Sequence, residues 1–172
     1  MKSKITPTNQ QRELRDDDFI VSKTDLKGRI TYCNRIFMEI AGYEESELLG
    51  IQHNIIRHPD MPRAVFNMLW ETLKGGQEFF GYIKNLCKDG SHYWVFANVT
   101  PSYNHKAEVV GYYSVRRRPR PEALQIITPI YQEMLAAEKK AGAVQAIPAS
   151  SAILKTKIAE FSKDYEHFIL EI

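Results

Sequence analysis

Residues 19–34 read FIVSKTDLKGRITYCN, and this stretch decides how the fold begins. Residues 19–21 and 30–32 are two short β-prone runs on either side of the turn TDLKG. The turn ends at Gly28, which can adopt the positive φ that tight hairpin turns require. The stretch therefore predicts a β-hairpin.

Short helical segments are expected after the hairpin. Asn34 can cap a helix that Gly42 ends, and EESELLG predicts one more helical turn before Gly50. A longer helix is predicted from near Pro62 to Gly75, because residues 65, 68, 69 and 73 are apolar at helical spacing. These helices separate the hairpin from the later strands.

Three further strands follow the longer helix. They are FFGYIKNLC (79–87), SHYWVFANVTPSY (91–103) and VVGYYSVRRR (109–118), separated by the turn segments KDG and NHKAE. Strands at both ends with helices between them predict an α+β fold, a five-stranded antiparallel sheet with short helices on one face. A ligand pocket between the sheet and the helices would be natural in this architecture.

The predicted sheet domain spans residues 18–119. Residues 1–17 are polar and are expected to form a flexible arm or a cap. We predict a helix at 120–142, a linker at 143–151 and an amphipathic C-terminal helix at 152–172. Apolar residues at 154, 158, 161, 165, 168 and 172 have the spacing of a coiled-coil seam, which could meet another subunit or fold back on its own domain.

Composition excludes several classes of protein. The 172 residues are 44% hydrophobic, enough for one ordinary domain with appended helices. Basic and acidic residues number 23 and 21, so charge gives no reason to expect nucleic acid as a partner. The short run RRRPR at 116–120 lacks interleaved aromatic residues and is interpreted as a solvated cap to the sheet.

Cysteine usage and hydropathy indicate the compartment. Cys33 and Cys87 form no CxxC pair, so neither a disulfide framework nor a zinc site is predicted, and no metal site is proposed. The sequence has no secretory h-region and no run of 18 uncharged apolar residues. We therefore expect a cytoplasmic protein without direct membrane insertion, which could associate with a membrane through a partner.

Residues 54–62, NIIRHPDMP, combine several polar groups just before the longer helix. The planar guanidinium of Arg57 suits phosphate or carboxylate, although an ion pair with Asp60 is the alternative. His58 could donate to a heterocycle, play a structural role or ligate haem. Asp60 could contact a cofactor or cap the helix. The stretch is a candidate binding segment.

The strands supply the remaining candidates. Asn85 and Asn98 lie within β-runs, and an amide can satisfy both donor and acceptor edges of a heterocycle. Tyr93 and Trp94 alternate faces, so only one of them can point into a pocket.

Four stretches together resemble a PAS domain, and within PAS domains the flavin-binding sensor of the bacterial aerotaxis-receptor type. They are SKTDLKGRITYCN, NRIFMEIAGYEESELLG, HNIIRHPDMPRAVFNMLWETLKGG and KNLCKDGSHYWVFANVTP. The resemblance covers about 100 residues, from Phe19 to Arg117. It implies an FAD between the sheet and the helices.

The resemblance also implies the cofactor-binding residues. The family's positions fall here on Asn34, Arg57, His58, Asp60 and Asn85. Where the family often has a tryptophan at the start of the third strand, this chain has Phe79, which keeps an aromatic ring and loses the hydrogen-bond donor. Light-sensing relatives form a cysteine adduct in the segment that reads GIQHN here, where no cysteine stands.

These observations lead to three functional hypotheses. The first is a non-enzymatic redox or energy-taxis sensor that binds FAD and signals to a membrane chemoreceptor or another signalling partner, as the stand-alone PAS component of bipartite energy-taxis systems does. The second is a cofactor-free module that forms homodimers through the sheet or the C-terminal helix. The third is a haem-binding gas sensor with His53 or His58 as axial ligand. No pairing of a nucleophile with a base predicts an enzyme.

Overall fold

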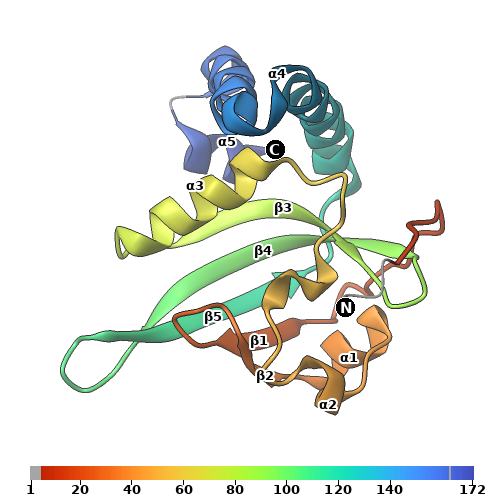
Figure 1. Ribbon diagram of the computed structural model, residues 1–172, viewed down its shortest axis with the longest axis vertical. Coiled ribbons are helices and arrows are strands. Elements are labelled where there is room, and N and C mark those ends of the chain that lie inside the picture. Colours follow the sequence, from red (N-terminus) through yellow and green to blue (C-terminus); the bar gives the residue numbers. More distant parts are fainter. Residues whose placement is uncertain (1–4, 163) are drawn as a thin grey trace.

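The computed structural model describes residues 5–162 and 164–172 and confirms the predicted α+β fold (Figure 1). Five strands form one sheet in the order β2-β1-β5-β4-β3, and every neighbouring pair is antiparallel. The strands are β1 (Ile20–Thr24), β2 (Ile30–Cys33), β3 (Phe79–Leu86), β4 (His92–Tyr103) and β5 (Val109–Arg117). The PAS-type sheet predicted from the sequence is therefore present.

The helices fall into two groups. Between β2 and β3 the chain forms α1 (Arg35–Ala41), α2 (Glu45–Leu48), the 3-10 helix η1 (His53–Ile56) and α3 (Arg63–Lys74). After the sheet come α4 (Pro121–Phe161) and α5 (Tyr165–Glu171), which lie together beside α3 and the β3 edge (Figure 1). The first group covers the inner face of the sheet, and the second closes one edge.

The turn of the β1–β2 hairpin is held by one carboxylate. Asp25 Oδ1 accepts hydrogen bonds from the backbone N–H groups of Lys27 (2.8 Å) and Arg29 (2.9 Å). Gly28 has φ of 76°, a conformation that a side chain would strain. The predicted hairpin and the predicted role of this glycine are confirmed.

Asn34 joins the hairpin to α1. Its Oδ1 accepts from the N–H groups of Phe37 (3.2 Å) and Val21 (3.0 Å), and its Nδ2 donates to Phe19 O (2.7 Å). The predicted N-cap is therefore correct, and both ends of the amide are occupied. The helix then buries Phe37 against the sheet.

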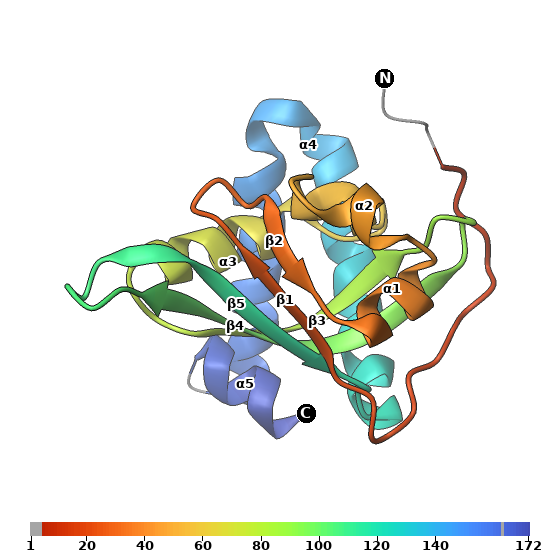
Figure 2. The ribbon, with the colours of Figure 1, turned by 90° about the horizontal axis from the view of Figure 1, so that it is seen from below.

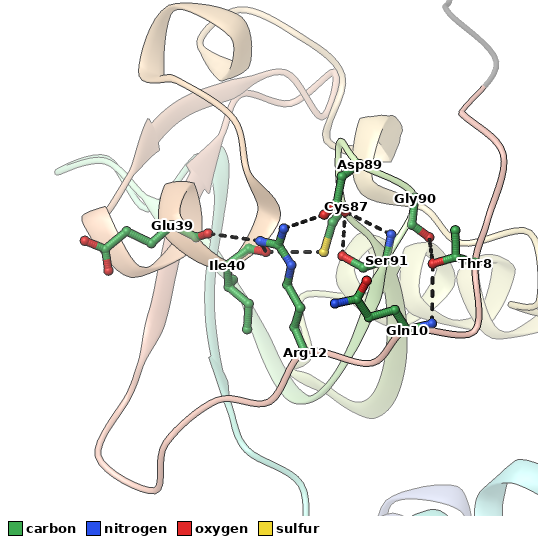
Figure 3. A network of polar contacts seen from close by, with 9 residues as sticks. All are labelled: Thr8, Gln10, Arg12, Glu39, Ile40, Cys87, Asp89, Gly90 and Ser91. Atoms are coloured by element: carbon green, nitrogen blue, oxygen red, sulfur yellow. Dashed lines mark hydrogen bonds and ion pairs between the residues drawn. The ribbon is translucent and has the colours of Figure 1, made fainter.

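An N-terminal segment clips the helical layer to the turn between β3 and β4 (Figures 2 and 3). Arg12 donates to Ile40 O (2.9 Å) at the end of α1 and pairs with Asp89 (2.6 Å) in the turn. Ser91 also donates to Asp89, and these contacts together lower the pKa of the Asp89 carboxyl to about 2. Residues 8–12 thus cover this side of the domain, as expected if residues 1–17 form a cap. Residues 1–4 of that segment lie outside the described residues.

The free edge of β3 is covered from several directions. Tyr131 of α4 donates its hydroxyl to Tyr82 O (2.9 Å), and the backbone of Asn85 forms an isolated bridge with Arg57. An uncovered edge strand would expose unpaired backbone groups. The edge contacts fix the loop that carries Arg57 against the sheet.

The predicted linker at 143–151 is wrong, because this stretch is helical. Only Gly142 departs from helical geometry inside α4, with φ of 73° and ψ of 174°. The second half of α4 turns back toward α3 (Figure 1). It buries four residues at intervals of four: Ala146, Ser150, Leu154 and Ile158. Tertiary packing of this face outweighs the turn-like composition of the stretch.

The predicted continuous helix at 152–172 is also wrong. Helix α4 ends at Phe161, and α5 starts at Tyr165 with Asp164 as its N-cap. The apolar residues Leu154, Ile158 and Phe168 are buried within the chain, whereas Phe161 is 59% exposed. The seam therefore folds back on its own domain. Among the described residues, the helices include none with the length and apolar character needed to cross a membrane.

A candidate ligand cavity between the sheet and the helices

A cavity of about 240 Å³ lies between the inner face of the sheet and the helical layer. Its sheet wall comes from β1, β3, β4 and β5, and its helical wall comes from residues 52–57 and α3. The sheet wall is apolar at Ile83, Ala97 and Val99, and the helical wall is apolar at Phe66 and Leu69. Polar side chains interrupt both walls at defined positions.

Arg116 is the charged residue of the sheet wall. Strand register places Arg116 opposite Ala97 and Ile20, so its side chain points inward. It is 3% exposed, and one terminal N–H donates to Ser22 Oγ. Its Nε and Nη1 have no hydrogen-bond partner among the described residues. Burial lowers the pKa of this guanidinium to about 10.

The interpretation of residues 116–120 as a solvated cap is wrong for Arg116. Arg117 and Arg118 are exposed, but the alternation of β5 turns Arg116 into the cavity. The strand pattern VVGYYSVRRR could have indicated this, because consecutive residues in a strand face opposite sides, so Arg116 and Arg117 cannot both be exposed on one face.

Asn85 is the second polar residue of the sheet wall. It is 4% exposed and lines the cavity, and its Nδ2 has no hydrogen-bond partner among the described residues. A buried amide without a partner costs free energy, about 1–3 kcal/mol. Its donor is therefore available to a ligand in the cavity.

His53 connects the two walls. Its Nε2 lies 3.2 Å from Ser22 Oγ, which already accepts from Arg116, so the serine proton is free to be donated to this nitrogen. Burial, and then the charge of Arg116, lower the pKa of His53 to about 3. The imidazole is therefore neutral at physiological pH, with its proton on Nδ1 by this hydrogen-bond pattern.

Arg57 lies on the helical wall and is half-buried. Its guanidinium carbon lies 4.1 Å from the centroid of the Phe66 ring. Burial lowers the pKa of Arg57, and the carboxylate of Glu138 on α4 opposes that shift. Of the described residues, Asp60 pairs with Lys84 (2.7 Å) and not with Arg57, so the alternative of an Arg57–Asp60 ion pair is wrong.

Asp60 does not cap the longer helix, and the capping interpretation is wrong. Helix α3 starts at Arg63 with Pro62 as the N-cap, which makes no side-chain cap bond. Asp60 is exposed and does not line the cavity. Its ion pair with Lys84 instead ties the segment before α3 to β3.

His58 is 2% exposed and lies outside the cavity lining. Its Nδ1 accepts from the Asp60 N–H (3.0 Å), and its ring meets His92 edge-on at 5.8 Å. Burial, followed by the charge of Lys84, lowers the pKa of His58 to about 4. The structure gives His58 contacts that order the loop.

The aromatic residues of the cavity differ from the expected one. Phe79 stacks on Tyr165 of α5 at 5.8 Å and does not line the cavity. Phe66, Trp70 and Tyr112 do line it, and the Trp70 and Tyr112 rings meet edge-on at 5.4 Å. The aromatic wall therefore comes from α3 and β5.

The remaining candidates lie off the cavity lining. Tyr93 faces inward and is fully buried, and burial raises the pKa of its hydroxyl. Trp94 takes the other face and stacks on Tyr131 at 6.3 Å, which answers the question of which ring points inward. Asn98 also lies on the outer face, where it contacts Glu78 (3.4 Å).

Of the eight residues predicted for the site, the structure brings Arg57 and Asn85 to the cavity. It places the other six elsewhere, namely Asn34, His58, Asp60, Phe79, Tyr93 and Asn98. Lining residues that were not predicted for the site include Ser22, Gln52, Trp70 and Arg116, and His53 was named only as a candidate haem ligand. Within the described part of the chain, His, Cys, Asp and Glu side chains form no group of three that could hold a metal ion.

Comparisons with known proteins agree with this architecture. The family model described as the PAS fold matches residues 30–116. The aerotaxis receptor of Escherichia coli (strain K12) is 41% identical over 134 residues, which are 78% of this chain and 26% of that protein. The nitrogen fixation regulatory protein of Klebsiella pneumoniae is 31% identical over 97 residues, 56% of this chain and 20% of that protein.

Solved structures share the fold. A light-oxygen-voltage domain studied with a flavin analogue superimposes with a TM-score of 0.57 at 21% identity, covering 67% of this chain and 86% of that one. The chain spans about a quarter or less of the length of the two curated relatives named above. The family model covers half of the chain, and the sheet order and helical layer agree with it: the chain belongs to the PAS-fold family.

Proposed function

We propose that this chain is a non-enzymatic sensor that binds FAD in the cavity and reports redox or energy status to a signalling partner. The observation that carries the proposal is Asn85, a buried amide that lines the cavity with an unpartnered donor. The aerotaxis receptor of Escherichia coli, a relative at 41% identity, supports the sensing role.

The lining residues fit a flavin head group. A planar three-ring system needs apolar surfaces on its faces and hydrogen-bond partners along one edge. Phe66, Leu69 and Val99 supply apolar surface, while Asn85 and Arg116 offer free N–H donors. Asn85 would orient the ring, and the neutral His53 would keep its Nε2 engaged with Ser22.

The size of the cavity suits part of a dinucleotide. At about 240 Å³ it is smaller than the roughly 300–1,000 Å³ pockets that enclose drug-sized ligands. The ring would enter the cavity and the phosphates would remain near the surface. Half-buried Arg57, with its planar guanidinium, is the residue we assign to a phosphate.

Bound flavin would supply reversible electron transfer, and the protein would supply two states with different contacts to the two oxidation states. The loop that carries Arg57 is bridged to Asn85 on β3, and β3 contacts α4 through Tyr131. A change at the cavity could therefore reach α4 and the outer surface. Trp94 and Phe96 on the outer sheet face are partly exposed and are our candidates for contact with a chemoreceptor or a second copy. We expect this function in the cytoplasm.

The visible absorption spectrum of protein purified with FAD supplied tests the proposal. Flavin bands and FAD released on denaturation are the expected result, whereas a Soret band would indicate haem and a colourless protein would support the cofactor-free alternative.

Two asparagines on opposite faces of the sheet make a matched pair for this experiment. Asn85→Leu should lower flavin affinity about 10- to 100-fold, since a buried hydrogen bond contributes about 1–3 kcal/mol. Asn98→Leu, on the outer face, should leave flavin affinity unchanged. Equal losses in the two variants, or none in Asn85→Leu, would contradict the assigned cavity.

A further inference from the structure

Arg116 carries a charge that the protein does not balance. The guanidinium is 3% exposed, and among the described residues it makes no ion pair with a carboxylate. Its surroundings include the hydroxyl of Ser22, the ring of Phe37 at 4.7 Å and the imidazole of His53, which Ser22 separates from it. Tyr93 and Cys33 also lie within its electrostatic reach, and burial raises the pKa of both, which keeps them uncharged. None of these groups is negative at neutral pH.

Such an arrangement is costly for a protein without a ligand. Burial of an unpaired charge is strongly unfavourable, and the unpartnered Nε and Nη1 donors add to that cost. The cation–π contact with Phe37 and the bond to Ser22 offset only part of it. A ligand group that brings negative charge would offset the rest.

Arg116 belongs to the same cavity as Asn85, on the other side of β4 in the sheet. Arg57, by contrast, lies on the helical wall and is half-buried. The two cations therefore face a ligand from different walls. If Arg57 binds a phosphate, the charge of Arg116 must be balanced by the part of the ligand inside the cavity.

We propose that Arg116 makes the cavity bind a negatively charged, reduced flavin ring more tightly than the neutral, oxidised ring, and so raises the reduction potential of the bound cofactor. This inference rests on the proposed flavin binding. Addition of two electrons and one proton to the oxidised ring leaves one negative charge on it. In the titration below, dithionite supplies the electrons and solvent supplies the proton.

The linkage between affinity and potential makes the inference measurable. If Arg116 favours the reduced form by 10- to 100-fold, its loss lowers the midpoint potential by about 30–60 mV, because tenfold in a two-electron equilibrium is about 30 mV. A role limited to packing would change the affinity for both oxidation states equally and leave the potential where it is.

The experiment is an anaerobic spectroscopic redox titration of the flavin-loaded protein at pH 7. We expect Arg116→Met to lower the midpoint potential by about 30–60 mV and Arg116→Lys, which keeps the charge, to restore most of it. Arg117→Met is the matched control, since Arg117 is the next residue, is exposed and lies over Phe96 at 5.2 Å. Its potential should equal that of the unmodified protein.

Several outcomes would overturn the inference. Equal potentials in the unmodified protein and Arg116→Met would do so, as would an equal shift in Arg117→Met, which would indicate only long-range charge. If Arg116→Met does not retain flavin, Arg116→Gln, which can still bond Ser22 but has no charge, must show the same lowered potential. Flavin bound with unchanged potentials refutes this inference alone, whereas no flavin in the unmodified protein refutes the proposed function as well.

Discussion

The two arginines of the cavity differ in how far the protein itself stabilises their positive charge. Arg57 on the helical wall is half-buried, stacks on Phe66 and is within the electrostatic reach of Glu138. Arg116 on the sheet wall is almost fully buried, and no carboxylate among the described residues pairs with it. The first cation is partly stabilised by its own protein, while the second depends on what enters the cavity. The two arginines are thus suited to different parts of the proposed ligand.

The largest expected effect is on the pH dependence of stability, and it involves two histidines. One of them is His53, whose pKa the charge of Arg116 helps to lower. The pKa values of His53 and His58 in the folded protein, about 3 and about 4, lie below the ordinary value near 6.5. As the pH falls below about 6.5 the unfolded chain binds protons that the folded chain does not, so stability is lost, by up to about 1.4 kcal/mol per pH unit for each histidine.

Urea denaturation between pH 7.5 and 4.5 checks this prediction. The unfolding free energy should be flat above pH 7 and should fall below about pH 6.5. His53→Asn should reduce the slope of the curve and leave the contribution of His58, whereas His105→Asn, at an exposed site in the β4–β5 loop, should leave the slope unchanged. A slope that His53→Asn leaves unchanged would contradict the neutral state of His53 in the folded protein.

Glu138 gives the next effect, on the helical wall. This 9% exposed carboxylate on α4 accepts from the Ala64 N–H (3.3 Å) in the first turn of α3, where the helix dipole favours a negative charge. Glu138→Ala should lower the unfolding free energy by about 1–3 kcal/mol, because it leaves the Ala64 N–H unpaired and removes the negative charge that partly balances Arg57.

Glu133 provides the control for that change. It lies on the same helix, is exposed and makes a 4.0 Å contact with Lys157. Glu133→Ala should change the unfolding free energy by less than about 0.5 kcal/mol. Equal effects of the two substitutions would show that Glu138 contributes nothing beyond an ordinary surface residue.

In protein from which any ligand has been removed, substitution of the two arginines should change the unfolding free energy in opposite directions. Arg116→Met replaces an unpaired buried charge by an apolar chain and should raise the unfolding free energy by about 1 kcal/mol or more. Arg57→Met loses the contact with the Phe66 ring and should lower it by about 0.5–1 kcal/mol. Thermal and urea unfolding measure both, and a loss of stability in Arg116→Met would contradict the comparison.

The sequence predicted the sheet and the helical layer because strand alternation, turn glycines and the cap at Asn34 act locally. It also led to Arg57 and Asn85, through the motif and through an amide placed in a strand. Arg116 was hidden because three arginines in a row look like a solvated patch, although strand alternation separates the first from the second. The helical nature of 143–151 could not be predicted from local sequence, since packing of Ala146 and Ser150 on the domain decides it.

Asp60 and Phe79 show a different limit. Asp60 has the residue type that the family resemblance implies, and Phe79 keeps an aromatic ring where the family often has a tryptophan. A distant segment nevertheless engages each of them, Lys84 for Asp60 and Tyr165 of α5 for Phe79. Residue type therefore predicts which kind of interaction a side chain can make better than it predicts which neighbour the side chain contacts.

Affinities of the ligand-free protein for riboflavin, FMN and FAD test the central claim most directly, namely that the ring lies in the cavity and the phosphates at Arg57. Calorimetric titration should show Arg57→Ala weakening FAD and FMN by about 10- to 100-fold while riboflavin, which has no phosphate, is bound as before. Asn85→Leu should weaken all three ligands alike. Equal loss of riboflavin and FAD in Arg57→Ala would contradict the account.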